Sequence, residues 1–131
     1  MSGEGRVASG EVRHYRDLVV WQKALIFVER VYAVSRSWPA DERFGLTGQV
    51  RRAAVSVPSN VAEGCGRRST PAFINHLAIA RGSLAEVETQ LILAERLGYL
   101  PADERDAVLA LADEISRMLA SLITKLEERR K

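Results

Sequence analysis

The sequence predicts an all-α protein, an antiparallel up-down-up-down bundle of four helices. Three observations predict this fold. Apolar residues recur at steps of three and four along four long stretches, which is the spacing of a helix face. Glycine and proline gather between these stretches and are sparse inside them. The 131 residues are 47% hydrophobic, which suits one domain with a core.

The chain divides into an N-terminal tail and the bundle. Residues 1–16 are polar, contain glycine and lack periodicity, so we expect a flexible tail there and the four-helix bundle over residues 17–131. Cys65 is alone, so no internal disulfide can form and a cytoplasmic protein is the simplest interpretation. We expect no membrane association, because no run reaches the roughly 20 apolar residues that span a bilayer.

The first helix should begin near Asp17, a suitable N-cap, and end near Ser37, before Pro39. It carries two apolar seams. One seam contains Leu18, Trp21, Leu25, Val28 and Tyr32, and the other contains Val20, Ala24, Phe27, Val31, Val34 and Trp38. One seam is enough for a monomeric bundle, and a second would leave an exposed apolar patch. The sequence therefore predicts a homo-oligomer.

The second helix should run from Leu46 to Gly64 or a little further, with Pro58 inside it. Proline removes a backbone donor, so the helix must kink or break there, and we favour a kink. Small residues such as Ala54 and Gly64 would let another helix approach closely. A polar stripe also follows this helix, made of Gln49, Arg52, Ser56, Asn60 and Glu63. It indicates either structural contacts with another helix or subunit, or a ligand site.

The third helix should run from Pro71 to Leu97, with Thr70 as its N-cap and Gly98 beyond its end. Gly82 inside it costs about 1 kcal/mol of helix propensity, which close packing against another backbone would explain. The fourth helix should begin at Pro101 and continue to the C-terminus.

Four motifs carry a resemblance to a known family. They are DLVVWQKA (17–24), FGLTGQ (44–49), QVRRAAVSVPSNVAEG (49–64) and HLAIARGSLAEVETQL (76–91). Together they resemble the ribosomal-RNA intervening-sequence proteins, small four-helix bundles encoded in inserts within 23S ribosomal RNA genes and elsewhere in bacteria. The resemblance implies a homopentameric barrel. It also implies similarity to the accessory protein of diversity-generating retroelements, which binds nucleic acid and serves a reverse transcriptase.

Charge is unevenly distributed along the chain. Residues 43–81 hold six arginines and one acidic residue, whereas residues 86–131 hold seven basic and ten acidic residues. This pattern indicates either a nucleic-acid footprint or charge pairing within or between chains. Guided by the resemblance, we expect RNA or DNA backbone contacts first from Arg51, Arg67 and Arg68, and then from Arg43, Lys125, Arg129 and Arg130. The net charge of only +2 weakens this hypothesis.

The alternative is a protein–protein scaffold or adaptor for a genetically linked partner such as a reverse transcriptase, without direct nucleic-acid binding. The salt dependence of binding distinguishes the two hypotheses. Binding through phosphate contacts weakens steeply as salt increases, whereas a mostly apolar protein contact does not. We expect no enzyme, no cofactor and no metal, since no nucleophile has an adjacent base and His76 lacks ligands at helical spacing. Cys65 lies near Arg67 and a helix end, which could lower its pKa, although an inert thiol is the simpler interpretation.

Overall fold

A computed structural model describes residues 14–130 of the chain. Four helices follow one another: α1 (Val19–Ser35), α2 (Leu46–Gly66), α3 (Thr70–Arg96) and α4 (Ala102–Arg130). Two 3-10 turns, η2 (Tyr15–Asp17) and η3 (Ala40–Glu42), precede α1 and α2. The part of the chain described contains no strand. The predicted all-α fold of four helices is therefore confirmed.

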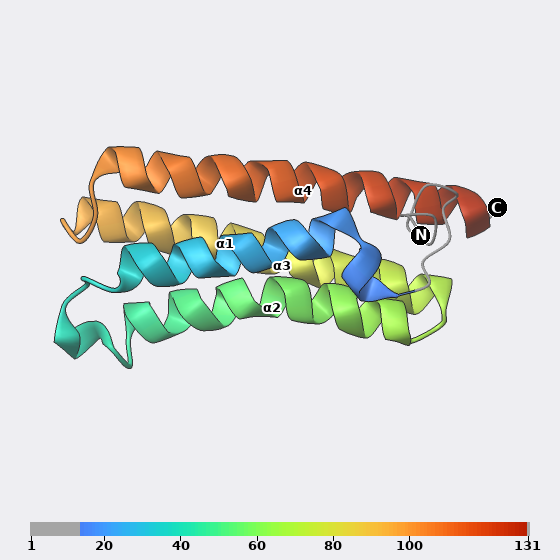
Figure 1. Ribbon diagram of the computed structural model, residues 1–131, viewed down its shortest axis with the longest axis horizontal. Coiled ribbons are helices and arrows are strands. Elements are labelled where there is room, and N and C mark those ends of the chain that lie inside the picture. Colours follow the sequence, from blue (N-terminus) through green and yellow to red (C-terminus); the bar gives the residue numbers. More distant parts are fainter. Residues whose placement is uncertain (1–13, 131) are drawn as a thin grey trace.

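The helices lie side by side as a four-helix bundle (Figure 1). Helix α1 packs against α2 and α4, and α3 packs against the same two helices. The α2–α3 turn, the start of α1 and the C-terminal end of α4 share one end of the bundle, which we call the C-terminal end. The α1–α2 and α3–α4 connections share the opposite end (Figure 1).

Each helix buries one of its apolar seams, and together these seams form the core. In α1, Val20, Ala24, Phe27 and Val31 are buried. The core residues of the two long C-terminal helices are Phe73, Leu77, Ala80, Leu84, Val87, Leu91 and Ala94 of α3, and Val108, Ala112, Ile115, Leu119, Leu122 and Leu126 of α4. The second seam of α1 stays partly open, since Leu25 and Tyr32 are 39% and 40% exposed. Within one chain, the second apolar face of α1 is therefore incompletely covered.

Two helix starts differ from the prediction. Asp17 belongs to η2, and α1 begins at Val19 without a side-chain cap. The N-cap of α3 is Ser69, not Thr70, because the Ser69 backbone is extended and its Oγ accepts the Ala72 N–H. The last residues of the predicted tail, Tyr15 and Arg16, belong to η2, whereas residues 1–13 lie outside the described residues.

Helix α2 is continuous through Pro58, which is buried, so the alternative of a broken helix is excluded. Gly98 follows α3 with φ +84°, as expected of a C-terminal glycine. The expectation for Gly82 is wrong within the chain, because a Cβ placed there would meet nothing within 4 Å. Gly82 faces open space on α3, so close packing inside the bundle does not explain this glycine.

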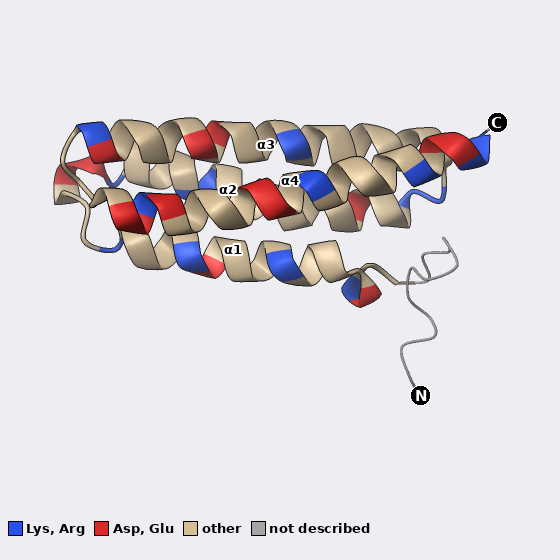
Figure 2. Cartoon of the chain, turned by 90° about the horizontal axis from the view of Figure 1, so that it is seen from above, with Lys and Arg blue, Asp and Glu red and all other residues tan. Residues whose placement is uncertain are grey.

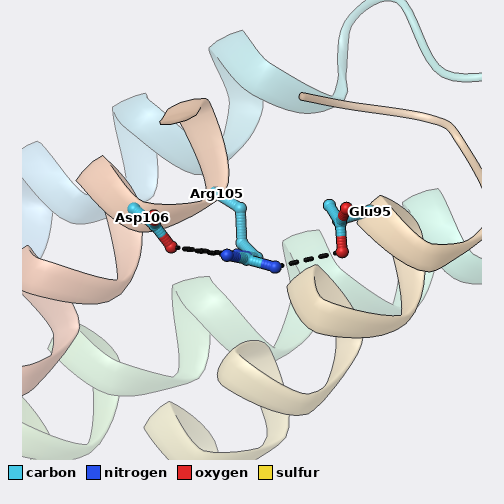
Figure 3. Close-up of polar contacts among 3 residues, drawn as sticks. All are labelled: Glu95, Arg105 and Asp106. Atoms are coloured by element: carbon cyan, nitrogen blue, oxygen red, sulfur yellow. Dashed lines mark hydrogen bonds and ion pairs between the residues drawn. The ribbon is translucent and has the colours of Figure 1, made fainter. Parts of the chain in front are cut away.

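Polar contacts connect the helices at the end of the bundle where the α1–α2 and α3–α4 connections lie. Glu42 accepts the Leu46 N–H at 3.0 Å and the Tyr99 hydroxyl at 2.7 Å, so it caps α2 and joins it to the α3–α4 turn. Hydrogen bonds from the Leu46 N–H and then from Tyr99 lower the pKa of Glu42. Arg105 donates to Asp106 beside it and to Glu95 of α3 (Figure 3), and these contacts raise its pKa. These contacts join the α1–α2 connection to the α3–α4 connection, and α4 to α3.

Candidate nucleic-acid interface

The antiparallel fold gathers five of the seven predicted basic residues at the C-terminal end of the bundle. These residues are Arg67 and Arg68 in the α2–α3 turn, and Lys125, Arg129 and Arg130 in the last turns of α4. Figure 2 shows basic residues in this turn and at the end of α4, on the same end of the molecule. All five are exposed. The fold thus joins two basic segments that are far apart in the sequence.

Some of these five residues form ion pairs with acidic residues nearby in the sequence. Arg67 pairs with Glu63 at 3.2 Å, and Arg130 pairs with Glu127 at 3.5 Å. Exposed pairs of this kind contribute little free energy, and either partner can exchange for another ion. These carboxylates reduce the net positive charge of the C-terminal end without removing it.

A small polar cavity of about 210 Å³ opens among these residues. Arg68, Ser69 and Thr70 line it from the α2–α3 turn, and Arg129 lines it from α4. Its remaining lining residues are Gly64, Cys65, Phe73 and Leu126. Arg68 has φ +57°, a left-handed backbone that turns the chain between α2 and α3. The cavity is the place where predicted basic residues of the turn and of α4 meet.

The other two predicted basic residues lie elsewhere. Arg51 reaches across to the end of α1, where its Nε donates to Ser35 Oγ at 2.9 Å and its guanidinium lies 4.5 Å from the Tyr32 ring centre. Ser35 is buried, so this contact ties α2 to α1. Arg43 lies at the opposite end of the bundle, over the ring of Phe44 at 5.4 Å. The structure therefore does not bring Arg51 and Arg43 together with the C-terminal cluster.

The polar stripe of α2 borders α3. Ser56 Oγ lies 2.8 Å from Ser83 Oγ, and Asn60 Oδ1 lies 3.0 Å from His76 Nδ1. The Asn60 amide also donates to the carbonyl and the hydroxyl of Ser56. These contacts join the two helices along their polar edge.

The rest of the stripe lies toward the two ends of α2. Gln49 and Arg52 line a groove of about 290 Å³ with Glu86 and Gln90 of α3, while Glu63 pairs with Arg67. The Oε1 atom of Gln90 is buried and has no hydrogen-bond partner. Glu63 is thus paired within the chain, whereas the groove beside Gln49 and Arg52 contains a buried acceptor without a partner.

Sequence reasoning missed the roles of His76 and Ser83 as partners of the stripe. The available signal was the position of Ser83, a polar residue next to Leu84 and three residues from Ala80, both of which face the core. For Cys65, the alternative of a lowered pKa is wrong, since burial raises the pKa of its thiol, in agreement with the simpler interpretation of an inert thiol. Residues 14–130 contain no group of three His, Cys, Asp or Glu side chains that could hold a metal ion.

Comparisons with known proteins agree with this architecture. A family model described as "23S rRNA-intervening sequence protein" matches residues 16–121. A solved structure of a protein of unknown function from the S23 ribosomal protein family, from Bacteroides thetaiotaomicron, is 28% identical, with a TM-score of 0.75. The match covers 81% of this chain and 96% of that one. No curated protein sequence matches the chain. None of the helices described is both long and apolar enough to cross a membrane.

Proposed function

The chain belongs to the 23S rRNA-intervening sequence protein family, and on this premise we propose that it is a non-enzymatic helical oligomer that binds the phosphate backbone of RNA or DNA. One observation carries the proposal. Arg67, Arg68, Lys125, Arg129 and Arg130 converge on the C-terminal end of the bundle. Arginine suits this task, because its planar fork matches phosphate oxygens. Recognition would rest on phosphate and shape, since residues 14–130 contain no recognised helix-turn-helix or zinc-finger motif.

Self-assembly would increase the positive charge that the proposed interface presents to a nucleic acid. We infer a homopentamer, as the family resemblance implies, with the outer face of α1 and α2 at the subunit contact. Leu25, Tyr32 and Val55 are each about 40% exposed there, and a groove of about 640 Å³ lies along Tyr32, Gly48 and Val55. A kink at Pro58 would curve α2 along such a contact. Five copies repeat each basic end, so a modest charge per chain becomes a larger surface field.

Salt-dependent binding tests this function. Light scattering of the purified protein, with and without a mixed RNA pool at low and physiological salt, should give the mass of about five chains and an RNA-bound species that salt dissociates. Arg68→Gln combined with Arg129→Gln should weaken RNA binding. The matched control, Arg36→Gln combined with Arg96→Gln, removes two exposed arginines at the opposite end and should have less effect. Binding that both double variants reduce equally would contradict an interface at the C-terminal end.

A scaffold for a protein partner is the second candidate. The observation that favours it is Phe44, which is 87% exposed at the end opposite the basic cluster. An exposed aromatic side chain is a common anchor at protein interfaces. An oligomer whose mass is indifferent to RNA at both salt concentrations would favour this scaffold over the nucleic-acid binder.

We propose that the protein has no catalytic role and is located in the cytoplasm. The thiol of Cys65 is a poor candidate nucleophile, because burial raises its pKa and so favours the unreactive protonated form. The cytoplasmic location rests on the single cysteine.

A further inference from the structure

We propose that the outer face of α3 is a second subunit contact, which packs into the groove between α1 and α2 of a neighbouring copy of the chain. The residues of this α3 face are Ile79, Glu86, Leu93 and Leu97. The inference rests on the proposed oligomer and deepens it, because the groove is only one half of such a contact. A closed ring of more than two copies needs two different faces on each chain, since its contacts are heterologous.

The α3 face carries an apolar stripe that the bundle itself leaves open. Ile79, Leu93 and Leu97 are 45%, 46% and 51% exposed. Ile79, Glu86 and Leu93 follow one another at steps of seven residues, so they lie along one side of the helix over about 21 Å. Soluble proteins rarely leave such a stripe to water, so a partner is expected to cover it.

The charges of the α3 face and of the groove are opposite. Arg51 and Arg52 line the groove, and no acidic side chain among residues 14–130 does. Glu86 is exposed between the apolar residues of α3. Within residues 14–130, neither Arg52 nor Glu86 is part of an ion pair. Glu86 of one copy can pair with Arg52 of the next, and this complementarity identifies a second copy as the occupant of the groove.

Arg52 and Glu86 lie at the same height along the bundle. Both line one depression at the α2–α3 edge, together with Gln49 and Gln90. In a barrel whose bundles stand parallel to its axis, rotation about that axis carries a side chain to the next copy without shifting it along the bundle. Glu86 of one copy therefore reaches the level of Arg52 in the next copy.

The apolar residues match in the same register. The Arg51 guanidinium lies over the ring of Tyr32, so Tyr32 marks the level of the two arginines on α1. Helices α1 and α3 begin at the same end of the bundle and run in the same direction (Figure 1). Leu25 precedes Tyr32 by seven residues. Ile79 precedes Glu86 by the same number, so each step covers about 10.5 Å. Ile79 therefore lies at the level of Leu25, and the two partly exposed side chains cover each other.

Light scattering of the protein without nucleic acid, together with circular dichroism, tests the apolar part of the contact. Ile79→Asp should shift the mass toward that of a single chain and keep the helical spectrum, because Ile79 is exposed in the single chain. Ile92→Asp is the matched control. Ile92 is 42% exposed on the same helix, but its place thirteen residues further on turns it about 140° away from Ile79. Ile92→Asp should keep the native mass, and an equal effect of both variants would overturn the α3 face.

Charge reversal tests whether the contact joins two copies. Arg52→Glu and Glu86→Arg should each lower the mass, because each variant places like charges at every contact. An equimolar mixture of the two should have a higher mass than either alone, since each variant offers the charge that the other one lacks. Mixing could not restore a pair formed within one chain. Glu128→Arg, at an exposed position of α4, is the control and should keep the native mass.

The outcomes separate this inference from the proposed function. A native oligomer whose mass neither reversal lowers, or whose mass the mixture does not raise again, would overturn the α3 face and leave the oligomer standing. A native protein with the mass of one chain would overturn this inference and the proposed oligomer together. Neither result bears on nucleic-acid binding at the C-terminal end, because no nucleic acid is present in these measurements.

Discussion

Gly64 of α2 lies directly against His76 of α3. A Cβ added to Gly64 would come within 2.7 Å of His76 Cβ and 3.0 Å of Phe73 Cδ1. We predict that Gly64→Ala lowers the free energy of unfolding, because overpacking of a core costs about 1–3 kcal/mol and exceeds the gain in helix propensity of about 1 kcal/mol. Urea denaturation at fixed protein concentration would measure the change.

Gly82 provides the matched control. It is also a glycine inside a helix, but a Cβ there meets nothing within 4 Å. Gly82→Ala should stabilise the protein by up to about 1 kcal/mol through helix propensity alone. A loss of stability at Gly82, or a gain at Gly64, would contradict these helix environments.

Asn60 should contribute more to stability than its partly buried position suggests. Asn60→Ala removes the contacts with Ser56 and His76 at the α2–α3 edge. We expect a loss of about 1–3 kcal/mol in the free energy of unfolding, because the former partners lose hydrogen bonds. Ser59→Ala changes an exposed neighbour on the same helix and should stay within about 0.5 kcal/mol of the native protein. Similar losses in both variants would rule out a special role for Asn60.

The contact between Glu42 and Tyr99 should make stability depend on pH. Because folding lowers the pKa of Glu42, its contribution is present above the unfolded carboxyl pKa, near 4.5, and is lost as the pH falls through the lower folded value. Tyr99→Phe should therefore reduce Tm most at neutral pH, and the difference from the native protein should narrow in acid. Tyr32→Phe removes a hydroxyl from an exposed tyrosine away from Glu42 and should leave the pH profile unchanged. A pH-independent effect of Tyr99→Phe would contradict this assignment.

Two neighbouring valines of α2 should separate assembly from folding. Val55 is 40% exposed on the proposed subunit contact, whereas Val57 is fully buried in the core. Val55→Asp should keep the helical circular-dichroism spectrum but lower the mass measured by light scattering. Val57→Asp should unfold the chain, since burying an unpaired charge costs several kcal/mol. A Val55→Asp variant with unchanged mass would exclude this face from the subunit contact.

Glu88 of α3 is affected by the charge of Asp113 of α4, and we expect its replacement to stabilise the protein. Partial burial and then the nearby charge of Asp113 raise the pKa of Glu88. Its charged form thus opposes folding at neutral pH, and the penalty disappears as the pH falls and Glu88 takes up a proton. Glu88→Gln should raise the free energy of unfolding by about 0.5 kcal/mol at pH 7 and by less in acid, as chemical denaturation at two pH values would show. A larger gain in acid than at pH 7 would contradict this sign.

The sequence by itself determined the four helices and most of their inward faces. Helix periodicity, Pro39, Pro71 and Gly98 act within a few residues of the chain, so their effects can be predicted locally. The same local reasoning placed the N-cap of α3 one residue late, because Ser69 and Thr70 are both good caps and only the turn at Arg68 distinguishes them.

The tertiary structure decided which polar residues meet. Arg68 and Arg129 share a cavity, while Arg51 is directed to Ser35 and not to the basic end. Gly64 is confined by His76, whereas Gly82 is open. These relations depend on the rotation and spacing of whole helices, which the core packing of all four sets together. A pattern along one helix shows which residues share a face, but it cannot show which residue of another helix lies opposite.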